Sequence, residues 1–145
     1  MVERSPRNIQ PLKLKPGKAA SAGAIIREPD GRIWLVEPTN KFFGYERTFP
    51  KGTKEPHCSL AATAAKEVFE ETGLLVEIGS FLIDVDRTAS VCRYFLGHRI
   101  DGDPSEIGWE TQAVCLVPLA QLSEMLPHEC DKPIVEALMM TLSAF

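Results

Sequence analysis

The 145-residue sequence predicts an α/β fold, a sandwich in which helices flank a mixed central sheet. One observation is the order of the patterns: a strand–turn–strand segment, then an alanine-rich helix, then more strands and two late helices. The other is composition, with 44% hydrophobic and 25% charged residues, which is typical of a globular domain. A chain of this length is expected to form one domain with its own core.

Residues 1–20 are expected to form a basic N-terminal arm, and residues 21–145 a single domain. The arm carries five lysines or arginines and three prolines but few large apolar residues, so we expect it to be extended. Two roles are open for it: a solubilising tail, or a positive lip that attracts a phosphorylated substrate.

The other elements follow from hydrophobic periodicity and from turn and cap residues. The run Glu28-Pro29-Asp30-Gly31 is typical of a hairpin turn between two strands, and Gly79 predicts a bend within a later strand. Strands are predicted at residues 22–27, 32–37, 74–84, 88–100 and 113–117, and helices at 60–72, 118–126 and 133–143.

The helix at residues 60–72 has the clearest local signals. Strong helix formers fill it, Ser59 is a suitable N-cap, and Gly73 fits the left-handed position that ends many helices. Its periodicity gives one apolar face and one acidic face.

The acidic face consists of Glu67, Glu70 and Glu71. Side chains three and four positions apart are neighbours on a helix, so these carboxylates repel one another. They also lie in the last turns, where the helix dipole disfavours anions. An ordinary solvated helix face is one interpretation of such a cluster. The other is a site for a hard divalent cation such as Mg²⁺ or Mn²⁺.

The segment from residue 52 to residue 74 resembles the Nudix box, the signature of the Nudix hydrolase family. That pattern runs Gly, five residues, Glu, seven residues, Arg-Glu, an aliphatic residue, any residue, Glu-Glu, any residue, Gly and an aliphatic residue. Cys58 and Lys66 depart from it, standing where the family has glutamate and arginine. The positions that match in register are Gly52, Glu67, Val68, Glu70, Glu71, Gly73 and Leu74.

The resemblance implies a Nudix-like α/β/α sandwich and a metal-dependent hydrolase. It implies that Glu67, Glu70 and Glu71 bind Mg²⁺ or Mn²⁺, which assists attack of water on a phosphoanhydride. The general base is either a box glutamate such as Glu70 or Glu110 on a later loop, with Glu106 the second candidate there. Residues 110–113 are similar to the Glu-x-Gln-Ala run of diadenosine tetraphosphate hydrolases.

Lys66 stands at the position whose arginine, by resemblance, orients the acidic cluster, so it is counted with the catalytic residues. Lysine keeps the charge but loses the planar fork, and it is expected to pair with Glu70 at i+4. Our hypothesis for Cys58 is that positions 58 and 66 have together given up a structural interaction, while metal binding by the other glutamates is retained.

Three residues are candidates for binding substrate: Lys51, Gly52 and Trp109. The run Phe-Pro-Lys-Gly at residues 49–52 resembles the box entrance of the branches that cleave dinucleoside polyphosphates and diphosphoinositol polyphosphates. Lys51 offers a point charge to a phosphate, and Trp109 a ring on which a base can stack. An exposed loop lysine and a core tryptophan are the plainer interpretations.

Dinucleoside polyphosphates or diphosphoinositol polyphosphates are therefore the expected substrates. Nucleotide sugars, oxidised nucleotides and capped RNA are alternatives within the family. A different class is a non-catalytic Nudix module that senses a nucleotide or polyphosphate, which the departures at Cys58 and Lys66 favour.

Composition sets the remaining expectations. A net charge of −4 argues against DNA binding through a basic surface, and no long apolar run predicts a membrane span. The four cysteines form no C-x-x-C pair, which favours free thiols in a reducing cytoplasm. We expect a cytoplasmic monomer or homodimer whose partner is a small-molecule phosphoanhydride.

Overall fold

The computed structural model describes residues 10–38, 47–104 and 111–143. Its elements follow the predicted order, and no helix among the described residues is long and apolar enough to cross a membrane. In chain order they are β1 (Ala19–Ile26), β2 (Ile33–Pro38), β3 (Lys51–Thr53), α1 (Leu60–Thr72), β4 (Leu74–Asp86), β5 (Ser90–Gly102), β6 (Thr111–Val117), the 3-10 turn η3 (Leu119–Gln121), α2 (Leu122–Met125), the 3-10 turn η4 (Glu129–Asp131) and α3 (Lys132–Ser143).

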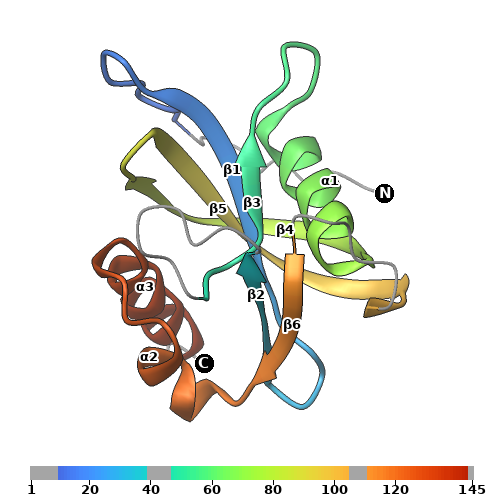
Figure 1. Ribbon diagram of the computed structural model, residues 1–145. Coiled ribbons are helices and arrows are strands. Elements are labelled where there is room, and N and C mark those ends of the chain that lie inside the picture. Colours follow the sequence, from blue (N-terminus) through green and yellow to red (C-terminus); the bar gives the residue numbers. More distant parts are fainter. Residues whose placement is uncertain (1–9, 39–46, 105–110, 144–145) are drawn as a thin grey trace.

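The main sheet has the strand order β3-β1-β5-β4, and β2 pairs with β6 in a second, two-stranded sheet. The main sheet is mixed, because β1 runs parallel to β5 while the other pairings in the sheet are antiparallel. Helix α1 covers one side of the sheet, and α2 and α3 lie on the other (Figure 1). The predicted α/β/α sandwich is confirmed.

Two apolar clusters fill the spaces on the two sides of the main sheet. The cluster beneath α1 is rich in small side chains, with Ala22 and Ala24 of β1 facing Ala61, Ala64 and Ala65 of the helix. The cluster beneath α3 is built from larger side chains, among them Phe49, Tyr94 and Leu138. Successive side chains of a strand point to opposite faces of the sheet, so alternate residues of β1 belong to the two cores.

Helix α1 begins and ends where the sequence predicts. Ser59 Oγ accepts a hydrogen bond from Ala62 N at 3.0 Å, which satisfies one of the free amides of the first turn. Gly73 adopts a left-handed conformation at φ 76°, and its amide donates to Phe69 O at 2.8 Å.

The predicted hairpin at residues 28–31 forms only at its turn. Glu28 O accepts from Gly31 N at 2.8 Å, and the Glu28 amide donates to Arg32 O at 2.9 Å. Beyond the single bridge between Arg27 and Ile33, the two strands separate and join different sheets. The turn is a local property, whereas the partners of each strand are set by the rest of the chain.

Strand β3 was not predicted, since residues 51–53 lie in a segment that reads as a loop. It pairs antiparallel with β1, placing Gly52 opposite Ala22, and it forms one edge of the main sheet. The predicted bend at Gly79 is confirmed, because the register of β4 against β5 shifts between Ile78 and Phe81.

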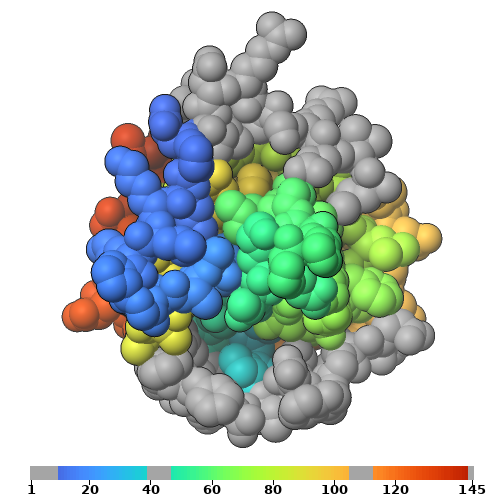
Figure 2. Space-filling model, turned by 90° about the horizontal axis from the view of Figure 1, so that it is seen from above, coloured from blue at the N-terminus to red at the C-terminus, as the bar shows by residue number. Residues whose placement is uncertain are grey.

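The described part of the N-terminal arm is attached to the domain. Lys15 Nζ lies 2.6 Å from Asp86 Oδ2, and Lys18 also pairs with Asp86. Arg93 Nη2 donates to the Gln10 carbonyl at 2.6 Å. The segment lies beside the turn between β4 and β5 (Figure 2). These two lysines therefore face a carboxylate of the domain itself, and the predicted boundary at residue 20 falls inside β1.

Candidate active site

The acidic face of α1 packs on the edge strand β3. The Glu67 carboxyl group occupies the space over Gly52, so that a Cβ at position 52 would overlap it. Beside it, Glu71 Oε2 accepts a hydrogen bond from the Lys51 amide at 2.8 Å. Glycine at position 52 is thus required by the close approach of a carboxylate to the backbone. The sequence singles out Lys51, Gly52, Glu67 and Glu71, and the structure brings them together.

Glu70 lies on the outer part of the same face, with half of its side chain exposed. Lys66 Nζ is 3.6 Å from Glu70 Oε1, which confirms the predicted i,i+4 pair. Lys66 also forms an ion pair with Glu55, in the loop that precedes the helix. The hydrogen bond from Lys66 to Glu55, supported by the field of Glu70, raises the pKa of Lys66.

Glu55 is a residue that sequence reasoning missed. It lies three positions before Cys58, and the Cys58 amide donates to the Glu55 carbonyl at 3.2 Å, so both belong to one turn. Lys66 therefore keeps a carboxylate partner from the helix entry, although position 58 offers none. The hypothesis for positions 58 and 66 is incomplete in this respect, because Glu55 supplies a charge that it leaves out. Cys58, like the other three cysteines, is a free thiol.

The donor set suits a hard divalent cation, because it consists of carboxylate oxygens on one helix face. Gly52 leaves the room above β3 that a carboxylate needs there. Within residues 10–38, 47–104 and 111–143, however, no three acidic, histidine or cysteine side chains already converge as a metal site. Glu67 and Glu71 are directed at β3, while Glu70 is directed at Lys66. The residues fit the ion in type and share one helix face, but their carboxylates do not converge, because Glu70 lies beside the Lys66 ammonium.

Three predicted site residues lie outside the described part of the chain: Glu106, Trp109 and Glu110. Their roles as second base candidate, stacking ring and general base stay predictions. The backbone of Thr111 and Gln112 starts β6, which pairs with β2.

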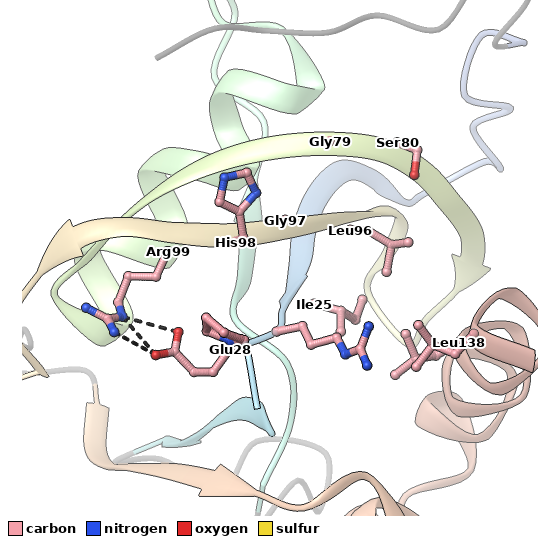
Figure 3. A pocket seen from close by; sticks show the side chains of 12 residues that line it. Ile25, Glu28, Gly79, Ser80, Leu96, Gly97, His98, Arg99 and Leu138 are labelled. Atoms are coloured by element: carbon pink, nitrogen blue, oxygen red, sulfur yellow. Dashed lines mark hydrogen bonds and ion pairs between the residues drawn. The ribbon is translucent and has the colours of Figure 1, made fainter. Parts of the chain in front are cut away.

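A cavity of about 540 Å³ lies away from the acidic face, between the main sheet and α3 (Figure 3). Its polar side chains include His98 and the pair formed by Arg99 Nη2 and Glu28 Oε1 at 2.7 Å. The hydrogen bond from Arg99 lowers the pKa of Glu28. None of the three box glutamates lines this cavity, so it is separate from the predicted site.

Together, these features define an α/β/α sandwich whose candidate site is an acidic helix packed on a glycine-containing edge strand. The chain matches the NUDIX domain family over residues 17–138, and it belongs to that family.

Among curated proteins, the human "Nucleoside diphosphate-linked moiety X motif 6" is 41% identical over 61 residues, which are 42% of this chain and 19% of the human protein. The chain therefore matches only about a fifth of that relative's length. Among solved structures, a NUDIX hydrolase from Nitrosomonas europaea has a TM-score of 0.73 at 18% identity, covering 86% of this chain and 90% of that one. An ADP-ribose pyrophosphatase from Streptococcus suis has a TM-score of 0.67 at 25% identity, covering 87% of this chain and 90% of that one.

Proposed function

We propose that this chain is a metal-dependent Nudix pyrophosphohydrolase, which cleaves a phosphoanhydride bond in a nucleoside-diphosphate-linked or polyphosphate substrate. The observation that carries the proposal is the packing of the acidic face on β3, through Glu67 at Gly52 and Glu71 at the Lys51 amide. Membership of the family, and the similarity to an ADP-ribose pyrophosphatase, support the same class of reaction.

Glu67, Glu70 and Glu71 would hold Mg²⁺ or Mn²⁺. When bound, such an ion neutralises charge on phosphate oxygens and lowers the pKa of a coordinated water. The chain's own contribution is to fix the carboxylates. The cap at Ser59 and the stop at Gly73 set the helix, and the contacts to β3 set two of the three side chains. The position of the third carboxylate, that of Glu70, depends on the Lys66 ammonium beside it.

Glu110 or a box glutamate, with Glu70 the first candidate, would accept a proton from the attacking water. The oxygen of that water attacks a phosphorus atom, and the bond from phosphorus to the bridging oxygen breaks. The Lys51 ammonium would bind a phosphate oxygen near this centre as a point charge. Trp109 would stack on a base where the substrate carries one.

For the substrate, we propose a dinucleoside polyphosphate or a diphosphoinositol polyphosphate. Support comes from the runs at residues 49–52 and 110–113, which resemble those of the corresponding branches. Nucleotide sugars, oxidised nucleotides and capped RNA are the competing substrates. The departures at Cys58 and Lys66 favour a second candidate function, a binding module that senses a nucleotide or polyphosphate without turnover.

The test is release of phosphate and nucleotide from a panel of phosphoanhydrides, in Mg²⁺ and in Mn²⁺, with Glu70→Gln run in parallel. Turnover of one compound class that Glu70→Gln abolishes supports the enzyme and identifies its branch. Binding of panel compounds and metal without turnover contradicts the enzyme and favours the sensor. Glu136→Gln, an exposed glutamate on α3, is the control for the loss of one negative charge.

A further inference from the structure

Lys66 has two carboxylate partners, and they are not equivalent. Its ammonium is in close contact with Glu55 Oε1, whereas Glu70 Oε1 is 3.6 Å away, beyond ordinary hydrogen-bond length. The pair on the helix also has the less favourable order, with the lysine preceding the glutamate by four residues. The position of the Lys66 ammonium is therefore set chiefly by the loop residue Glu55.

Glu55 is itself fixed by the chain around it. Its carbonyl accepts from the Cys58 amide, and the next residue, Ser59, caps α1. The backbone of Glu55 is thereby held next to the first turn of the helix, while Lys66 and Glu70 lie on the second and third turns. Glu55 therefore contacts the Lys66 ammonium from the loop that precedes the helix, whereas Glu70 lies one turn further along it.

We propose that Glu55 is a positioning residue that keeps the Lys66 ammonium from hydrogen bonding to Glu70, so that their ion pair is loose enough for a divalent cation to take the Glu70 carboxylate. This inference rests on the proposed function in one respect, since it takes Glu70 to be a metal ligand. What is new is that Glu55, which is not a position of the Nudix box, controls how readily Glu70, which is one, can bind a metal.

The physical reason is competition between two cations for one carboxylate. With Glu55 removed, Glu70 is the carboxylate still within reach of Lys66 in the i,i+4 geometry. An ammonium that moves onto Glu70 must then be displaced when the metal binds. Removing Lys66 as well removes the competitor, so the absence of Glu55 should no longer matter.

The experiment measures the dissociation constant for Mn²⁺ alone, by the decrease of its free-ion EPR signal, in Glu55→Gln, Lys66→Met and the double variant. From the usual strength of exposed ion pairs, we expect Glu55→Gln to weaken Mn²⁺ binding about two- to fivefold. In the Lys66→Met background, the same substitution should have no effect. Glu136→Gln controls for charge far from the site, and melting temperatures in EDTA show that each variant is folded.

Wild-type affinity in Glu55→Gln would overturn the proposal. An equal weakening in the Lys66→Met background would also overturn it, because Glu55 would then act on the metal only through its own charge. If the wild-type protein binds no Mn²⁺, this inference and the proposed metal-dependent function both fail. Mn²⁺ binding with the expected pattern, but no turnover of any panel compound, would contradict the proposed activity alone.

Discussion

Arg87 and Asp131 form an ion pair inside the protein, with Arg87 Nη1 3.1 Å from Asp131 Oδ1 and Asp131 fully buried. Arg87 follows the end of β4, and Asp131 belongs to η4, so the pair joins the main sheet to the α3 layer. Thr48 Oγ1 donates to the same carboxylate oxygen at 3.3 Å, and Arg87 Nη1 also donates to the buried Tyr94 hydroxyl at 2.5 Å. Burial raises the pKa of Asp131, while the guanidinium opposes that shift.

Asp131→Asn should destabilise the fold strongly, because it leaves the Arg87 charge buried without its counter-ion. Breaking a buried pair from one side typically lowers the free energy of unfolding by about 3 kcal/mol or more. Urea denaturation followed by fluorescence measures the difference. Asp30→Asn is the matched control, since its pair with Arg32 is exposed and its loss should change the free energy of unfolding far less. Equal effects of the two substitutions would show that burial does not govern the Asp131 pair.

Gly52→Ala should reduce activity far more than stability. The added methyl group would displace the Glu67 carboxyl group from its place over β3. A displacement of about 1 Å in a catalytic group can lower kcat/KM roughly a hundredfold. Steady-state kinetics on the substrate found in the panel measures this, together with Mn²⁺ affinity. Thr53→Ala, at the exposed neighbouring position of β3, should leave kcat/KM close to the wild-type value.

Acid should weaken the attachment of the N-terminal segment. Hydrogen bonds from Lys15 and then Lys18 lower the pKa of Asp86 in the folded protein. A group with a lowered folded-state pKa stabilises the fold above its unfolded pKa, and that contribution disappears as the pH falls below about 4. Asp86→Asn should therefore reduce the dependence of the melting temperature on pH in this acid range. An unchanged dependence would show that these ion pairs do not contribute.

Ser59→Ala should destabilise the helix that carries the acidic face. Without the hydroxyl acceptor, the Ala62 amide loses its partner in the first turn. The expected decrease in the free energy of unfolding is about 1 kcal/mol. Chemical denaturation measures it, with Ser80→Ala, an exposed serine of β4, as the control. Equal stability of Ser59→Ala and the wild type would contradict this account of the cap.

The sequence predicted α1 to the residue because its signals are local. Ser59 and Gly73 act on the amide and carbonyl groups next to them, and the helix between them needs no distant partner to be recognised. The same locality explains why the turn at residues 28–31 was predicted correctly while the pairing of its two strands was not. Strand partners depend on the other strands of the sheet, and periodicity alone does not name them.

The candidate site likewise has one part that could be predicted from the sequence and one part that could not. The glutamates of α1 and the glycine at position 52 are positions of the Nudix box, so the resemblance implied their shared location. The pairing of Lys66 with Glu55 could not be predicted, because eleven positions separate them and the ion pair forms only when the loop folds back on the helix. Strand β3 was missed because Lys51, Gly52 and Thr53 carry no strand pattern, and their pairing comes from β1.

Helix α1 packs on the main sheet through alanines. These include Ala61, Ala64 and Ala65 on the helix and Ala22 and Ala24 on β1. Small side chains bring the helix axis close to the sheet and leave little space in which it could tilt. In a mutational scan, these positions should therefore be as intolerant of change as the glutamates of the acidic face. The position of the acidic face would then depend on side chains that have no oxygen or nitrogen atom with which to bind a metal or a substrate.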